Sequence, residues 1–469
     1  MRQFKRYGLI ASLATVLAWG LAGCGGSEKA SQSPKIVYSS VVSFGDSLSD
    51  PGAYKVGAIA ALGGGLFTVN GINGAIGADP SPSYTWAQLV SAAAVGAPSC
   101  AARVGGFGVP VSTIAGCTNY AQGGSRITNP MGTGNTGDLN GALTEPVVTQ
   151  VINYLNSTPN GLFTGNELVT VQGGANELFA QATVLTLAAQ AEGNRVGGLT
   201  FSSTFVGLLA SGATDPVTAA QAIGLAMATE AARVGSDTSS IIAAGVLAAA
   251  SQPGNLAVGA PAVYGPMAIT AQTAATTAGT AAGNQYAATT GASIALTGMV
   301  AAAAELSASV KNMLAKGAKR IVVTNLPDVS LTPYALATIT VTAGVTDNST
   351  QQLVLAMTKA FNDKLKADLA GISGLLYVDV FTENQSQIAN PSQFGLSNVK
   401  DTACDLRFGF NPLATAGNSD GSSLACKPGN LISGNTSRYL FADSVHPTPY
   451  GHKLLSQLIT KELVLAGWL

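Results

Sequence analysis

Short apolar runs rich in β-branched residues alternate along the chain with longer stretches that have helical periodicity. Four of these runs are expected to be strands, at residues 35–44, 167–174, 318–327 and 374–381. Helices are expected between and after them, at residues 301–317, 355–372 and 449–467. Strands that are separated by helices predict a parallel sheet covered on both faces.

The stretch VVSFGDSLSD, residues 41–50, places Ser47 directly after the first predicted strand. In a parallel sheet, ligand sites lie beyond the carboxyl ends of the strands. A serine at that rim has an exposed hydroxyl and can act as a nucleophile. The alternative is that Gly-Asp-Ser is an ordinary turn, which is the commoner outcome when nothing else supports a site.

A serine hydroxyl attacks a carbonyl only when a base takes its proton, and a carboxylate orients that base. The chain has two histidines, His446 and His452, both within FADSVHPTPYGHKL. Asp443 precedes His446 by three residues, and Pro447 keeps His446 in a loop. His452 falls inside the last predicted helix, where a solvated or packing role is expected. The loop pair is therefore the candidate acid and base, unless the spacing is a coincidence.

Two further glycine-rich segments, each expected to follow a strand, contain amide groups that could stabilise negative charge on a carbonyl oxygen. The segment NYAQGGSR, residues 119–126, offers backbone amides that glycine leaves accessible. The segment GGANEL, residues 173–178, offers the side-chain amide of Asn176, a neutral donor at any working pH.

The region between Thr238 and Ala304 contains no Asp, Glu, Lys or Arg and is dominated by alanine and glycine. Small residues allow helices to pack closely, so the favoured interpretation is a set of helices buried inside the domain. The alternative is an inserted helical lobe with an apolar, lipid-tolerant face beside the active site. Residues 401–438, rich in Gly, Asn and Ser, are expected to be a long loop.

The first residues have the pattern of an export signal. A positively charged start is followed by an apolar segment that ends in LAGC, which resembles the bacterial lipobox. Residues 1–23 are then a lipoprotein signal peptide, Cys24 is the lipidated residue, and residues 24–34 are a flexible tether. Gly25, in place of an Asp, favours the outer membrane. The alternative is a plain secretory signal, and later release from the membrane is left open.

Cysteine usage is consistent with export, because four cysteines remain once Cys24 is set aside. Their proximity in the sequence suggests the pairs Cys100 with Cys117 and Cys404 with Cys426, the alternative being four free thiols.

The 469 residues allow one large domain or two to three smaller ones, and the net charge of −1 without any basic run argues against nucleic-acid binding. Scarce histidine argues against a zinc cluster.

These segments, in this order, resemble the four conserved blocks of the GDSL or SGNH hydrolase family. FGDSLSDPG and the segment AKGAKRIVVTNLPDVSLTP, residues 315–333, are similar to the secreted lipase, lecithinase and hemolysin branch. The resemblance spans about residues 36–180 and 315–465. It implies a three-layer α/β/α sandwich with a flavodoxin-like, mostly parallel sheet over residues 35–469, interrupted by an Ala/Gly-rich helical insertion at about 180–305.

The resemblance also implies roles for individual residues. Ser47 is the nucleophile, and Asp443 and His446 complete the catalytic triad. The amides of Ser47, Gly124 and Asn176 form the oxyanion hole, with Gly123 as the alternative to Gly124. No metal or other cofactor is implied, and the protein is expected to act as a monomer on an ester or lipid.

Two departures from the family pattern concern substrate fit more than the reaction. The third block ends in Asn176-Glu177 where the family usually has Asn-Asp, and Pro51 stands where Thr or a small residue is usual.

A competing nucleophile motif, GNSDG at residues 417–421, lacks the flanking strand and helix that a nucleophile elbow needs. GNTGDLNG, residues 134–141, lacks the spacing of a calcium loop.

The sequence therefore predicts a cell-envelope esterase or lipase that forms an acyl-enzyme on Ser47. Two alternatives remain open at this point. One is an O-deacetylase that acts on polysaccharide with the same fold, and the other is an envelope lipoprotein whose scaffold binds without catalysis.

Overall fold

The computed structural model describes residues 36–342, 345–416 and 421–469. The signal peptide, the tether and Cys24 lie outside the described residues, and so does most of the GNSDG motif. The expectations that concern these segments stay predictions.

Four parallel strands form the central sheet, in the order β1 (Ser40–Phe44), β4 (Glu167–Val171), β5 (Ile321–Thr324) and β8 (Leu375–Val378). Each lies within one of the four predicted apolar runs. On the free side of β1, Asn119 forms a parallel bridge with Ser43. Counted along the chain, the five extended segments stand in the order 2-1-3-4-5, which is the doubly wound, flavodoxin-like arrangement. The expected fold class is confirmed.

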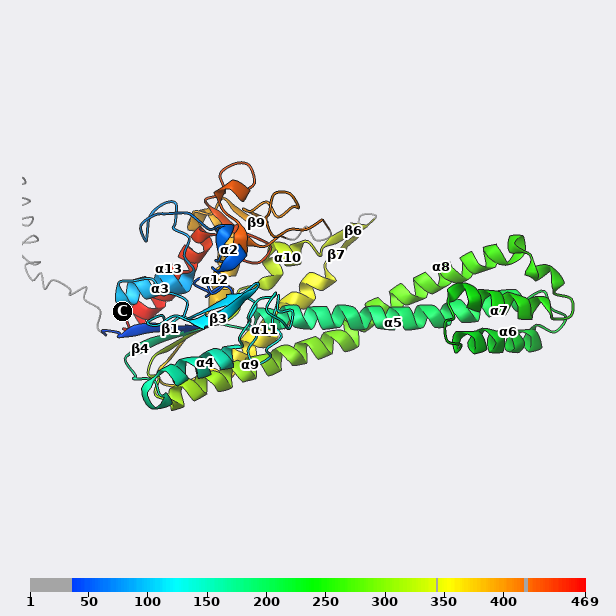
Figure 1. The fold of residues 1–469 in the computed structure, drawn as a ribbon, viewed down its shortest axis with the longest axis horizontal. Coiled ribbons are helices and arrows are strands. Elements are labelled where there is room, and N and C mark those ends of the chain that lie inside the picture. Colours follow the sequence, from blue (N-terminus) through cyan, green and yellow to red (C-terminus); the bar gives the residue numbers. More distant parts are fainter. Residues whose placement is uncertain (1–35, 343–344, 417–420) are drawn as a thin grey trace, which may run out of the picture.

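Helices cover both faces of this sheet, as the alternation of apolar residues along the strands requires (Figure 1). Val42 and Phe44 of β1 point into a core formed with α4 (Val147–Ser157), α9 (Ala292–Ala315) and α11 (Ser349–Leu369). Val41 points to the opposite core, where the covering helices are α3 (Trp86–Val95), α12 (Val380–Ala389) and α13 (Pro449–Leu465). These layers are the predicted α/β/α sandwich.

Local sequence signals set the ends of the covering helices. Helix α3 begins with a capping box between Thr85 and Gln88 and ends at Gly96, which adopts the left-handed conformation. Helix α13 begins at Pro449, directly after Thr448, whose hydroxyl oxygen accepts a hydrogen bond from the Gly451 amide.

Smaller elements lie in the segments that connect the strands and helices of the sandwich. They are the helices α2 (Gly57–Ala61) and α10 (Pro333–Leu336), the antiparallel pairs β2 (Arg103–Gly106) with β3 (Val109–Thr113) and β6 (Thr340–Thr342) with β7 (Val345–Asp347), and the parallel pair β9 (Asn398–Thr402) with β10 (Tyr439–Phe441).

A long helical arm projects from the sandwich (Figure 1). It is built from α5 (Ala175–Ala210), α6 (Pro216–Ala231), α7 (Thr238–Ala250) and α8 (Pro261–Tyr286), and it returns to the sheet as α9. Helix α5 has 36 residues, which corresponds to about 50 Å at 1.5 Å per residue. Helices α6 and α7 pack together at the far end, around the buried side chains of Phe205, Leu209 and Ile223.

Glycines allow α5 and α8 to approach each other along the arm. A Cβ added at Gly193 would lie 2.9 Å from the Gly279 carbonyl oxygen, and one at Gly279 would lie 2.7 Å from the Gly193 carbonyl oxygen. Gly283 faces the Ala189 carbonyl oxygen in the same way, at 3.0 Å. Contact between the two backbones therefore depends on the absence of side chains at these positions.

The charge-free region forms much of this arm, and the expectation that it is buried inside the domain is wrong. Small residues do mediate close packing there, but between two helices that are solvent-exposed on their other sides. Large apolar side chains remain exposed on the arm, among them Leu225, Leu247 and Ile269, each at 69–71%. Asn176 lies in the first turn of α5, and the arm extends from there away from the sandwich, so its apolar far end does not lie next to the predicted site either (Figure 1).

The stretch Pro261–Ala315 is long and apolar enough to cross a membrane by length and composition alone. Core helices pass the same test, and the α9 part of this stretch packs against the sheet through Met299, Leu306 and Val310.

Both predicted disulfides are present. Cys100 is bonded to Cys117 and Cys404 to Cys426. The second bond lies within the predicted loop of residues 401–438, where it joins Cys404 to Cys426, and both cysteines are buried.

The packing of α5 against α8 predicts a contrast between neighbouring glycines. Gly198 has open space where a Cβ would lie, so Gly198→Ala should raise the free energy of unfolding by up to about 1 kcal/mol through helix propensity. Gly193→Ala should instead be about 1–3 kcal/mol less stable than Gly198→Ala, because its methyl group meets the α8 backbone. Urea unfolding followed by circular dichroism measures both; equal stability would refute the backbone contact.

Candidate active site

Ser47 lies just beyond the carboxyl end of β1, where the chain turns sharply. Gly45 makes the turn possible, because a Cβ at this position would lie 2.6 Å from the Gln172 carbonyl oxygen. The side chain of Gln150 in α4 fixes the Gly45 backbone from both sides, accepting from its amide and donating to its carbonyl, each at 2.8 Å. The sequence thus places Ser47 at the rim of the sheet on a rigid turn.

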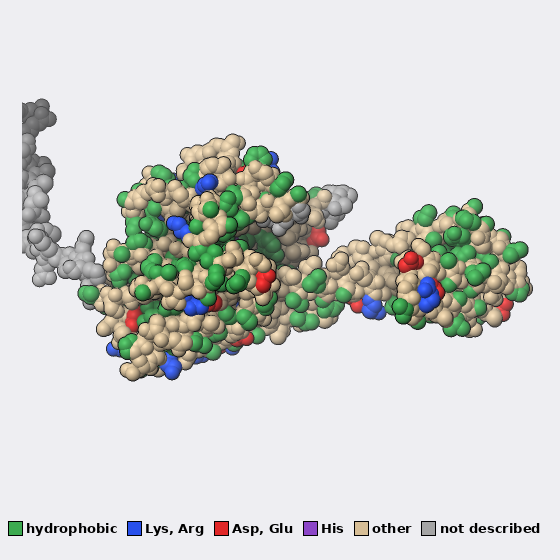
Figure 2. All heavy atoms as spheres, viewed as in Figure 1, with side chains coloured by type: hydrophobic (Ala, Val, Ile, Leu, Met, Phe, Trp, Pro, Cys, Tyr) green, Lys and Arg blue, Asp and Glu red, His purple; other side chains and the backbone are tan. Residues whose placement is uncertain are grey.

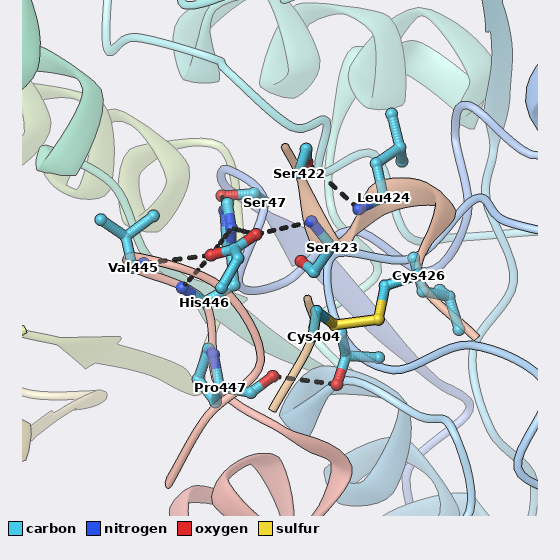
Figure 3. Close-up of polar contacts among 12 residues, drawn as sticks. Ser47, Cys404, Ser422, Ser423, Leu424, Cys426, Val445, His446 and Pro447 are labelled. Carbon is cyan, nitrogen blue, oxygen red and sulfur yellow. Dashed lines mark hydrogen bonds and ion pairs between the residues drawn. A yellow bond between two sulfur atoms is a disulfide. The ribbon is translucent and has the colours of Figure 1, made fainter. Parts of the chain in front are cut away.

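The structure brings Ser47, His446 and Asp443 into one hydrogen-bonded chain, and Figure 3 shows Ser47 and His446 next to each other. The Oγ of Ser47 lies 2.8 Å from Nε2 of His446. On the other side of the ring, Nδ1 lies 2.8 and 2.9 Å from the two carboxylate oxygens of Asp443. Asp443 and His446 follow β10 in a tight loop, in which the Ala442 amide donates to the His446 carbonyl oxygen.

Asp443 is buried and held by four donors. Its Oδ1 accepts from the Val445 and His446 amides, its Oδ2 accepts from the Ser423 amide at 2.8 Å, and the imidazole lies against both oxygens (Figure 3). Burial opposes the charged form, but the neighbouring imidazole of His446 and these hydrogen bonds hold the pKa of Asp443 well below its usual range. An ionised Asp443 keeps the proton of the neutral ring on Nδ1, which leaves the Nε2 lone pair facing the Ser47 hydroxyl.

The predicted oxyanion donors lie around the same point. Ser47, Gly124 and Asn176 all line one cavity with His446. Within the part of the chain that the structure describes, the amides of Ser47 and Gly124 have no hydrogen-bond acceptor. Asn176 donates one of its two side-chain hydrogens to the Ser125 carbonyl oxygen at 3.0 Å, and the other remains for a ligand.

The choice between Gly123 and Gly124 depends on their partners. The Gly123 amide donates to Oδ2 of Asp50 at 2.8 Å, so it is not available to stabilise an oxyanion. Gly124 has a positive φ of 80°, and a Cβ there would lie 2.1 Å from the Thr133 carbonyl oxygen. Its amide is therefore the one available to a substrate, and no other residue fits at that position.

The position of Asn176 is fixed because the residue lies in the first turn of α5. The neighbouring Glu177, which replaces the usual Asp, forms an ion pair with Arg126 at 2.5 Å and accepts from the Ile127 amide at 3.0 Å. The longer acid therefore connects the start of α5 to the segment that follows Gly124.

Two further carboxyl groups flank Ser47 and are fully buried. Burial raises the pKa of Asp46 to about 6 and that of Asp50 to about 6, even though each accepts backbone hydrogen bonds. Asp50 accepts from the amides of Gly52, Ala53 and Gly123, which joins the segment after Ser47 to the oxyanion segment.

The cavity in front of Ser47 has a volume of about 430 Å³ and is mostly apolar. This volume is in the range of small-molecule sites. The polar end holds Ser47, His446 and Asn176, and the apolar walls come from segments far apart in the sequence, including Phe67, Phe107, Phe179, Val329, Leu413 and Leu424. Figure 2 shows apolar side chains inside a hollow of the sandwich, at the base of the arm.

A larger groove of about 720 Å³ runs along α5 and α8 in the arm. Its lining has no histidine, cysteine or charged side chain, so it offers no acid–base chemistry. Across the described ranges, no group of three or more His, Cys, Asp or Glu side chains could hold a metal ion.

His452 lies away from the reaction, as expected from its place in a helix. It is completely buried, so of the two expected roles packing is the one observed. Its Nδ1 accepts a hydrogen bond from the Trp86 amide at 3.3 Å. Burial lowers the pKa of His452 to about 3, so the ring is neutral at physiological pH.

Several residues of the site carry no signal in the sequence. Ser423 reaches the triad and Leu424 the cavity because their loop is held by the Cys404–Cys426 bond and by hydrogen bonds from Asn70, and the proximity of Cys426 is the one hint in the sequence. Asp50 stands in the first block without a recognisable role, and Gln150 sits in an unremarkable helix.

The fold is of the kind found in the GDSL/SGNH family. The family described as GDSL-like lipase/acylhydrolase matches residues 295–459, a segment that contains Asp443 and His446 but not Ser47. Over this segment the chain is similar to GDSL-like lipases and acylhydrolases.

Relatives in Arabidopsis thaliana are similar to parts of this chain. A GDSL esterase/lipase is 26% identical over 154 residues, covering 32% of this chain and 39% of the relative. The anther-specific proline-rich protein APG is 32% identical over 108 residues, covering 22% and 18%. Another GDSL esterase/lipase is 31% identical over 103 residues, covering 21% and 23%. The alignments thus span less than half of each relative's length.

The buried His452 predicts a component of acid sensitivity. Its pKa is about 3 in the folded protein and about 6.5 in the unfolded chain, so below pH 6.5 the unfolded chain binds a proton that the native state does not. The free energy of unfolding should therefore fall as pH drops from 6.5, by roughly 1 kcal/mol per pH unit from this group. His452→Gln, which retains an acceptor for Trp86, should flatten that slope. Urea unfolding at several pH values measures it, and parallel curves would contradict the assignment.

Proposed function

We propose that this protein is a serine ester hydrolase that cleaves carboxylic esters through an acyl-enzyme on Ser47. The observation that carries the proposal is the continuous chain from the Ser47 hydroxyl through His446 to a buried, ionised Asp443. That arrangement activates a serine nucleophile, and the family relatives named as esterases or lipases support the same chemistry.

The geometry accounts for each step of the reaction. Ser47 Oγ attacks the ester carbonyl carbon while Nε2 of His446 takes its proton, and Asp443 stabilises the resulting imidazolium. The negative charge that develops on the carbonyl oxygen is met by the amides of Ser47, Gly124 and Asn176. His446 then returns the proton to the leaving alcohol. Water attacks the acyl-enzyme by the same route and releases the acid.

The cavity indicates the kind of ester. An acetyl group would fill little of a 430 Å³ space, whereas an acyl chain or another apolar substituent would contact its phenylalanine and leucine walls. This favours an esterase, lipase or phospholipase-like activity over an O-deacetylase acting on a polar polysaccharide. The triad geometry disfavours a purely binding scaffold.

We also propose that the enzyme works at the cell envelope, tethered by a lipid on Cys24. The support is the charged start, the apolar segment and the LAGC sequence of the first residues, together with the two disulfides, which are typical of an oxidising compartment. A tether would hold the cavity near lipids without a spanning helix.

A chain-length series of nitrophenyl esters tests the proposed activity. The specificity constant kcat/KM should rise from acetate to longer esters, by up to about fourfold for each methylene that enters the cavity. Ser47→Ala should abolish turnover, and Asn176→Ala should lower kcat by about 10²–10³-fold through loss of one oxyanion donor.

Ser203→Ala is the matched control, because Ser203 lies exposed on the arm and should retain full activity. Full turnover by Ser47→Ala would end the proposed mechanism. A preference for acetate alone would instead favour the deacetylase.

A further inference from the structure

A buried tyrosine, which does not line the cavity, forms a hydrogen bond with the peptide between Gly123 and Gly124. The Oη of Tyr54 donates to the Gly123 carbonyl oxygen at 2.6 Å, and Tyr54 is completely buried. The same hydroxyl accepts from the Thr144 amide at 3.3 Å. Tyr54 does not line the substrate cavity, so any effect it has on the reaction passes through this peptide.

Peptide planarity determines what this hydrogen bond does. The Gly123 carbonyl and the Gly124 N–H belong to one peptide unit, and in a trans peptide they point in opposite directions. A hydroxyl that fixes the carbonyl on the Tyr54 side therefore fixes the N–H on the other side. Gly124 lines the cavity, so that other side is the one on which the substrate oxygen would lie.

A second anchor acts on the preceding peptide. Asp50 accepts the Gly123 amide through Oδ2, while its Oδ1 accepts the amides of Gly52 and Ala53. Asp50 is three residues after Ser47, so it joins the nucleophile segment to the oxyanion segment. Glycine at 123 and 124 leaves this backbone intrinsically free to rotate, and the two anchors remove that freedom.

The ring of Tyr54 is itself held in place. It packs edge-to-face against Phe67 and Phe107, with ring centroids 6.1 and 5.3 Å apart. Phe67 in turn lies 4.9 Å from the His446 ring. Burial raises the pKa of Tyr54 well above its ordinary value, so the hydroxyl keeps its proton and stays a donor throughout the working pH range.

We propose that Tyr54 and Asp50 are positioning residues for the oxyanion hole, because they hold the Gly123 carbonyl and amide so that the Gly124 N–H faces the reacting oxygen. This inference rests on the proposed ester hydrolysis. It adds that the segment from Ser47 to Tyr54 supplies, besides the nucleophile, the groups that orient a donor on a different loop.

Tyr54→Phe removes the hydroxyl and keeps the ring packing. Because the oxyanion charge exists only in the transition state, kcat should fall about 10–10²-fold while KM changes little. This loss is smaller than that for a deleted donor, since the Gly124 amide is still present. The Ser47 hydroxyl adds to the carbonyl of an alkyl trifluoromethyl ketone and forms a stable oxyanion. Tyr54→Phe should bind this inhibitor more weakly than the wild type by a similar factor.

Tyr154→Phe is the matched control. Tyr154 is also buried and donates its hydroxyl to a carboxylate, Oε1 of Glu167, but at the amino-terminal end of β4. It should lose stability without losing kcat. If the two variants lose kcat equally, or if Tyr54→Phe stays within twofold of the wild type, the positioning role is refuted.

If Tyr54→Phe does not unfold cooperatively and is therefore not properly folded, Asp50→Asn tests the positioning role instead. It keeps the shape of the side chain but replaces one acceptor oxygen with a donor, and it should show the same loss of kcat at nearly constant KM. An unchanged kcat in a folded Asp50→Asn would overturn the proposal. A wild type without esterase activity, or an active Ser47→Ala, would instead remove the proposed function on which the inference rests.

Discussion

The parallel pairing of β1 with β4 is the constraint on which the rest of the site depends. Phe44 is opposite Val171 in the register, so both strands end at the same level of the sheet. Their continuations, together with the segment after Asn119 on the other side of β1, diverge at the point where the order of the sheet reverses. A crevice at this position is a consequence of doubly wound topology, before any catalytic residue is considered.

Hydrogen bonds between the diverging segments turn that crevice into a rigid site. Gln150 holds Gly45, Asp50 holds Gly123, and Glu177 holds the segment after Gly124. Each of these groups is buried or nearly so, and a buried polar group that lost its partner would cost about 1–3 kcal/mol. The network therefore fixes the distance between nucleophile and oxyanion donors without contacting the substrate.

The proposed catalysis requires a fourth segment as well, which comes from the carboxyl-terminal part of the chain. The loop after β10 carries His446 to Ser47, and the disulfide-closed loop supplies the Ser423 amide that completes the environment of Asp443. Cross-linking restricts that loop, which otherwise has little regular structure. Oxidation of Cys404 and Cys426 thereby supports the geometry of the active site.

Periodicity and residue chemistry predicted much of this arrangement. The four strands, the final helix, the disulfide pairs and the neighbours Ser47, His446 and Asp443 follow from apolar runs, from the small number of cysteines and histidines, and from the family resemblance. A helical insertion at about residues 180–305 was expected, but its form as an exposed arm was not, because a charge-free run of small residues has the same composition in a buried core and in a pair of exposed helices. Tyr54, Gln150 and Ser423 could not be found either, since contacts between distant backbone groups leave no local pattern.

The activation of Ser47 by His446 is the central claim, and covalent labelling tests it most directly. A fluorophosphonate reacts only with an activated serine, and peptide mapping by mass spectrometry identifies the labelled residue. We predict a single adduct on Ser47 in the wild type and at most trace labelling of Ser47 in His446→Ala. An adduct on another serine, or equally rapid labelling of Ser47 in the His446→Ala protein, would contradict this claim.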